Sequence, residues 1–111
     1  MNNKHEISLQ TAIEMTNRYR QNQPADFPVC ETFEAEAVSK LLSAEGCAFL
    51  RIYYGMKEEM QAHAILVAVN ASNEDILPSV HASQVPVDDP VILDDGYRSP
   101  PACPKPSPLY P

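Results

Sequence analysis

The stretch CAFLRIYYGMKEEMQAHAILVAVN, residues 47–70, decides the fold of this 111-residue chain. Both of its ends are rich in β-branched and aromatic residues, a composition typical of strands. The charged centre, residues 56–60, separates the two ends by the length of a hairpin loop. We therefore predict two antiparallel strands, over residues 47–55 and 63–70. The second is apolar on both faces and should lie inside the sheet or be covered on both sides.

The register of this hairpin decides whether it carries a polar cluster. Alternation places Arg51 and Tyr53 on the same face of the first strand. In one register they share that face with His63, and the three side chains form a candidate site for an anionic ligand, a carboxylate or phosphate held by the arginine fork. A small ligand-binding protein or an enzyme would use such a site.

The other register makes one face fully apolar. A shift of one residue places Leu50 and Ile52 beside Ile65 and Val67, and Arg51 then lies among the small residues of the second strand. We favour this register, because it gives the helices a continuous apolar face to cover.

Two helices are expected before the hairpin. The first covers residues 9–21, with Ser8 as its N-cap, and the second covers residues 33–45, with Thr32 as its cap. Gly46 supplies the left-handed residue that follows the second helix. The expected core consists of apolar residues from both helices and both strands: Leu9, Ile13, Val38, Leu41, Leu42, Leu50, Ile52, Ile65 and Val67.

The chain changes character after the hairpin. A short segment, residues 75–77, is expected as an edge strand because Pro78 stops it. Eight of the eleven prolines lie in residues 86–111, so we expect a compact domain over residues 1–85 followed by a Pro-rich segment. The apolar cluster Val91, Ile92 and Leu93 indicates docking of that segment onto the body as an added strand. The predicted fold is α+β, with two helices on one face of a small antiparallel sheet, either a hairpin or a three-stranded meander.

The last residues, SPPACPKPSPLYP, allow three interpretations. Proline spacing at Pro101 and Pro104 fits a polyproline II ligand for a partner protein. Alternatively, Leu109 and Tyr110 are apolar groups suited to filling a groove on the chain's own body, which would make the tail a strap. A disordered end is the third possibility.

No reactive constellation is visible in the sequence. The three histidines and three cysteines show no ligand spacing, so no metal and no cofactor is predicted, and enzymatic activity is not expected. The carboxylate pair at Asp94 and Asp95 is interpreted as a solvated turn. The net charge of −7 disfavours nucleic acid and anionic membranes as partners. The polar N-terminus and the absence of a C-x-x-C motif favour a cytoplasmic protein with reduced thiols.

The order of these segments resembles a group of small bacterial hypothetical proteins. The similarity rests on the first helix, ISLQTAIEMTNRYR, on the LRIYYG and ILVAV strands, and on the Pro/Cys tail. Members of the group carry paired cysteines in the tail, whereas this chain has only Cys103 there. The resemblance implies the same order of elements and leaves the function open. The missing catalytic residues, together with a tail and a sheet edge able to bind protein, lead us to expect a non-enzymatic protein-interaction or accessory module, acting on a protein partner or as a homodimer through the sheet.

Overall fold

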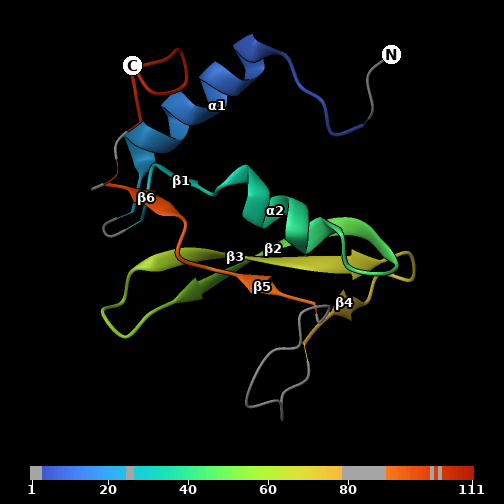
Figure 1. Cartoon of the computed structure of the whole chain (residues 1–111). Coiled ribbons are helices and arrows are strands. Elements are labelled where there is room, and N and C mark those ends of the chain that lie inside the picture. The colour runs from blue at the N-terminus through green and yellow to red at the C-terminus, as the bar shows by residue number, and fades with distance from the viewer. Residues whose placement is uncertain (1–3, 25–26, 79–89, 101, 103) are drawn as a thin grey trace.

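A computed structural model describes residues 4–24, 27–78, 90–100, 102 and 104–111 of the chain. The fold is α+β, with two helices, a two-stranded antiparallel sheet and a four-stranded antiparallel sheet (Figure 1). In chain order the elements are α1 (Leu9–Asn22), β1 (Cys30–Thr32), α2 (Ala35–Leu42), β2 (Cys47–Met56), β3 (Ala62–Asn70), β4 (Asp75–Ile76), β5 (Ile92–Leu93) and β6 (Tyr97–Ser99). None of the described helices has the length and apolar character needed to span a lipid bilayer.

The predicted hairpin is confirmed as β2 and β3, but the favoured register is wrong by one residue. Ile52 lies opposite Leu66, and Arg51 lies opposite Val67. Ile65 and Val67 therefore share the face of Arg51, and Ile52 lies on the other face with Leu66. The register that groups Arg51 with the odd-numbered residues of β3 is the one that forms.

The hairpin loop and a third strand explain this register. The loop of residues 57–61 closes with the Met60 amide donating to the Lys57 carbonyl at 2.8 Å, and Met60 has a left-handed φ of 65°. In this register Arg51 lies on the same face as Asp75 of β4, and the two side chains form an ion pair. Because Arg51 has a carboxylate partner, its place on a partly covered sheet face costs little. Grouping the apolar residues on one face was therefore not enough to predict the register.

The second helix is shorter than predicted. It begins at Ala35, and the N-cap position belongs to Glu34, whose side chain makes no capping hydrogen bond. Thr32, the expected cap, lies instead in β1. The helix packs on the sheet through Leu41, which is fully buried against Leu66 and Ala68 of β3.

The first helix is confirmed, but it does not bury an apolar face on the sheet. The Ser8 side chain caps it, accepting from the Thr11 amide at 3.0 Å. No residue of α1 is buried, and Leu9 is 60% exposed. The helix is anchored instead to the loop before β1, where the Tyr19 hydroxyl donates to the Pro28 carbonyl at 2.6 Å.

The position of α1 explains the errors in the expected core. Leu41 and Val67 are buried as predicted, and Ile13, Val38 and Ile65 are half-buried. The residues that prove to be exposed are Leu9, Leu42, Leu50 and Ile52. Both helices lie on the same side of the sheet in Figure 1, but only α2 covers it, so the β2 part of that face stays open.

One edge of β3 is covered by two short strands in succession. The expected edge strand is confirmed as β4, which pairs with Ala68 and Val69. The expected added strand is confirmed as β5, which pairs with the adjacent Leu66 and Val67. Residues 79–89 lie outside the described part of the chain, so the expected division at residue 85 stays a prediction.

Beyond β5, side chains of the small β1–β6 sheet continue along the same edge of β3. The Ala64 amide donates to Glu31 Oε2 at 2.8 Å, and Arg98 Nε donates to the Ala62 carbonyl at 2.9 Å. Glu31 and Arg98 are cross-strand neighbours in the β1–β6 pair. A carboxylate and a guanidinium thus join the two sheets. Neither β1 nor β6 was predicted from the sequence.

Candidate functional site

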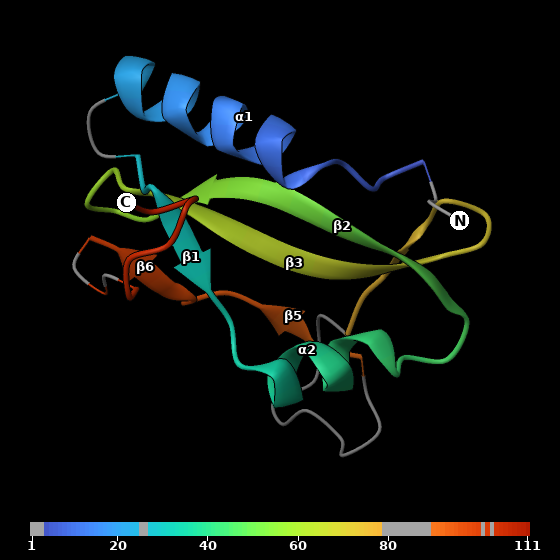
Figure 2. The same cartoon turned by 90° about the horizontal axis from the view of Figure 1, so that it is seen from above.

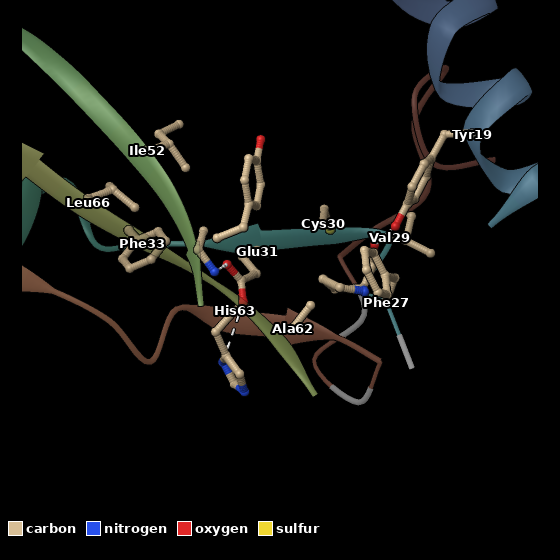
Figure 3. Close-up of a pocket in the computed structure, with 13 residues that line it drawn as sticks. Tyr19, Phe27, Val29, Cys30, Glu31, Phe33, Ile52, Ala62, His63 and Leu66 are labelled. Carbon is tan, nitrogen blue, oxygen red and sulfur yellow. Dashed lines mark hydrogen bonds and ion pairs between the residues drawn. The ribbon is translucent and has the colours of Figure 1, made fainter. Parts of the chain in front are cut away.

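An apolar groove lies over the open part of the sheet. Seen from above in Figure 2, α1 and α2 lie along the two flanks of β2 and β3, over the same face, and the groove on that face has a volume of about 600 Å³. In Figure 3 the side chain of Tyr19 stands on one side, Ile52, Leu66 and Phe33 on the other, and Cys30 between them. The face that the two helices were expected to cover is therefore a concave surface.

Small residues form the floor of this groove, and larger ones form its walls. Ala62 and Ala64 of β3 line it, and their short side chains leave space above the strand. The β2 wall is exposed, with Ile52 48% and Tyr54 84% accessible. The groove consequently presents apolar surface to the solvent, and contiguous exposed apolar surface typically marks a binding site.

The opposite wall is held by contacts outside the sheet. The Tyr19 hydroxyl donates to the Pro28 carbonyl at 2.6 Å, and burial raises the pKa of this phenol. Phe33 packs against Gly96, where an added Cβ would come within 2.7 Å of the ring. These contacts hold the aromatic side chains of the groove in place.

The strand beside the groove is also an unpaired edge. β2 is ten residues long, and among the described residues β3 is its only partner strand. Its outer backbone groups therefore have no strand partner within the described chain. An exposed apolar edge strand of this length is a template for pairing with another chain.

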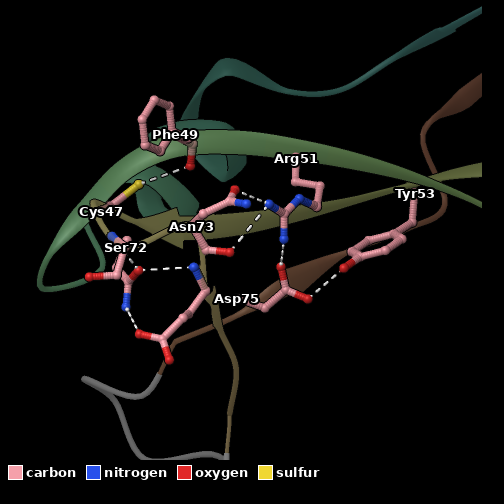
Figure 4. Close-up of polar contacts among 9 residues, drawn as sticks. Cys47, Phe49, Arg51, Tyr53, Ser72, Asn73 and Asp75 are labelled. Atoms are coloured by element: carbon pink, nitrogen blue, oxygen red, sulfur yellow. Dashed lines mark hydrogen bonds and ion pairs between the residues drawn. The ribbon is translucent and has the colours of Figure 1, made fainter.

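The predicted ligand residues Arg51 and Tyr53 do come together, on Asp75 (Figure 4). Arg51 Nη1 donates to Asp75 Oδ1 at 2.6 Å, and the Tyr53 hydroxyl donates to Asp75 Oδ2 at 2.6 Å. Arg51 Nη2 also donates to the Asn73 side chain. Hydrogen bonds with Tyr53 and Asp75 raise the pKa of Arg51 above its usual range. An anionic ligand at this cluster would have to replace Asp75.

His63 has different neighbours, although it shares that face of the sheet. It is 9% exposed, and its nitrogens lie 3.7 Å from Glu31 Oε1 and 3.7 Å from Glu59 Oε1. In Figure 3 its ring points away from the side chains that line the groove. The contacts of His63 are with carboxylates, so a three-residue anion site stays a prediction without an observation in its favour.

The predicted tail residues lie against α1 and β1. Pro104, Leu109 and Tyr110 line a small hollow of about 250 Å³ with residues of both elements. The Tyr110 and Ser99 hydroxyls are 2.9 Å apart, and the Leu109 carbonyl accepts from Arg20 at 2.7 Å. Pro101 lies outside the described residues.

Sequence reasoning missed the groove because its walls come from elements that are distant in sequence. Tyr19 and Phe33 fall within the expected helix ranges, residues 9–21 and 33–45, and nothing in the sequence placed them beside the strands. The sequence signal for β1 is short, a Val-Cys pair between a proline and a glutamate, and its partner β6 lies beyond residue 90. Ile52 was expected in the core, so the groove is evident only from the position of α1 in the folded chain.

No known protein family, curated protein or solved structure matches this chain. The resemblance to small bacterial proteins accordingly stays a prediction, and the function must be argued from the residues themselves.

Proposed function

We propose that the protein is a non-enzymatic interaction module that binds an extended apolar segment of a partner protein. The observation that carries this proposal is the apolar groove beside the unpaired edge of β2. Groove and edge together match the two requirements of strand addition. The backbone edge offers hydrogen bonds, and the groove accepts alternate side chains.

The geometry of β2 favours an extended segment over a helix. Ile52 and Tyr54 lie two positions apart on one face of the strand and border the groove. A partner strand added to β2 would present its own side chains with the same two-residue period. Every second side chain of that strand would then meet the groove.

Charge favours a neutral or basic partner. The chain carries a net charge of −7, so an acidic peptide would be repelled at long range. A second copy is less suitable for the same reason. A symmetric contact would also place one concave groove against another and leave both unfilled.

The other expectations are less well supported. An anion-binding role would require the ligand to displace Asp75 from Arg51. A role of the tail as a partner ligand is disfavoured by the contacts of Leu109 and Tyr110 with their own chain. We place the module in the cytoplasm, and the free thiols of Cys30 and Cys47 are consistent with that.

A peptide selection tests the proposal. A displayed library of random peptides is selected on the full chain, and the peptides obtained are measured by fluorescence anisotropy. We expect sequences with apolar residues at alternating positions. We expect Ile52→Asp to weaken their binding by roughly tenfold or more, because it places a charge in an apolar groove.

The matched control is Phe49→Asp, which places the same charge on the opposite face of the same strand. Phe49 is 53% exposed, so this variant should fold and bind the selected peptides as the parent chain does. Failure to select any peptide that distinguishes the two variants would contradict the proposal. Light scattering on the chain without peptide tests whether a second copy fills the groove instead. A dimer that dissociates in the Ile52→Asp variant would mean that it does.

A further inference from the structure

A second cluster lies at the loop end of the β2–β3 hairpin, next to the groove. His63 of β3 meets Asp94 and Asp95, which lie between β5 and β6. One ligand atom from each of the three residues lies within 4.8 Å of the others. Histidine nitrogen and carboxylate oxygen are the donors that protein sites offer to divalent metals.

The burial of His63 is the observation that distinguishes this cluster from an acidic turn. The residue is 9% exposed, and among the described residues neither ring nitrogen has a hydrogen-bond partner. Glu31 Oε1, 3.7 Å from His63 Nδ1, is buried and also lacks a hydrogen bond in the described chain. Buried polar atoms in folded proteins normally have a partner, and an ion or water is the usual one where no protein group serves.

The charges around His63 favour a cation. Four carboxylates lie close to it, those of Glu31, Glu59, Asp94 and Asp95. Lys57 contacts two of them: its Nζ lies 3.9 Å from Asp94 Oδ2 and pairs closely with Asp95 Oδ1. Arg98 lies beside Glu31 across the β1–β6 pair, so two cationic side chains face four carboxylates and negative charge remains in excess.

We propose that His63, Asp94 and Asp95 bind a divalent transition-metal ion, represented here by Zn²⁺. Lys57 competes with the metal for the two aspartates. The imidazole ligand selects Zn²⁺ over Mg²⁺, which takes oxygen ligands and retains its water. Zinc ligands lie about 2.0–2.2 Å from the metal, so the two aspartates must move inward from their positions in the described structure. Asp95 is 74% exposed at its side chain, and it can move once Lys57 leaves. Glu59 or a water would complete the coordination.

Zinc titration of the full chain tests the site. We expect ZnCl₂ to raise the melting temperature and MgCl₂ at the same concentration to leave it unchanged. Co²⁺, a spectroscopic substitute for zinc, should give visible absorption typical of nitrogen and oxygen ligands. Asp94→Asn and Asp95→Asn should each weaken zinc binding by about tenfold or more, because each removes a charged ligand.

Two further variants keep the test decisive. Lys57→Met should tighten zinc binding, because it removes the competing cation, although it also removes a surface ion pair. Glu36→Gln removes an exposed acidic group outside the cluster and should leave the affinity unchanged. Zinc that binds the Asp94→Asn/Asp95→Asn double variant as tightly as the parent chain would be held elsewhere, for example by the thiols, and would overturn the proposal. Absence of zinc binding to the parent chain would overturn it as well.

Discussion

Arg51 of β2 and Asp75 of β4 form an ion pair across β3, with 2.6 Å between Nη1 and Oδ1. The pair connects the first strand of the sheet to the third, and both side chains are partly shielded from solvent. It therefore ties the short strand β4 to the hairpin.

We expect Arg51→Met and Asp75→Asn each to lower the melting temperature by a few degrees. The double variant should be little worse than either single one, because each single substitution already breaks the pair. Thermal melts of the four proteins in a double-mutant cycle measure this. Arg18→Met, at an exposed position of α1, is the control and should have little effect. Additive losses would show that the two side chains act independently.

Adjacent leucines of α2 should differ widely in their contribution to stability. Leu41 is fully buried and Leu42 is 44% exposed. Leu41→Ala should cost about 2–5 kcal/mol, because it leaves a cavity against β3. Leu42→Ala should cost less than about 1 kcal/mol. Urea unfolding of both variants gives the comparison, and equal losses would mean that α2 does not pack on the sheet as described.

The Lys57–Asp95 pair makes stability depend on pH in the acid range. The hydrogen bond and charge of Lys57 hold the pKa of the Asp95 carboxyl below its usual range. A depressed pKa stabilises the fold above the unfolded-state pKa of about 3.9. That contribution is lost as the pH falls through the lower folded-state pKa.

Melting curves of the parent chain and Asp95→Asn at several pH values test this without added metal. The parent should be the more stable protein near neutral pH, and the difference should disappear in acid and shrink in high salt, since both groups are exposed. A difference that persists in strong acid would assign the effect of Asp95 to something other than its charge.

Removal of the C-terminal segment should destabilise the body. A chain ending near Gln84 lacks β5, β6 and the Arg98 contact with β3. We expect it to melt several degrees lower or to aggregate, since about 1 kcal/mol shifts the midpoint of a domain this size by roughly 4–8 °C. Coincident melts of the long and short chains would show that the segment adds nothing to the fold.

A second truncation separates the tail from the strands. A chain ending at residue 102 keeps β5 and β6 but loses Leu109 and Tyr110, which contact Arg20 and Ser99. It should lie between the other two chains in stability, because it loses only the contacts of the last residues.

Local signals predicted local structure well. Ser8 predicted the start of α1, and Gly46 has the left-handed φ expected of it, 82°. The hairpin followed from the composition of its two halves. In these cases the deciding contacts lie within a few residues of one another.

The errors involve contacts that are distant in sequence. The register depended on Asp75, which the hairpin sequence does not contain. The pairing of β1 with β6 joins residues near 31 to residues near 98, and neither strand has a strong sequence signal of its own. Asp94 and Asp95 are exposed, as expected of a solvated turn, but their approach to His63 joins residues that are far apart in the chain and was not predicted. Each of these features appears only when the whole chain has folded.

β4 and β5 pair with neighbouring parts of the same edge of β3, and this arrangement affects the order in which that edge is completed during synthesis. β4 follows β3 directly, but β5 is made later, after residues 77–91. At translation rates of about 5–20 residues per second, the Leu66–Val67 stretch of β3 waits roughly a second or more for its partner. During that interval the backbone of Leu66 and Val67 lacks its β5 partner, and these residues can pair only with β2. The side of Leu66 and Val67 that faces β5 is therefore the last part of β3 to gain its strand partner.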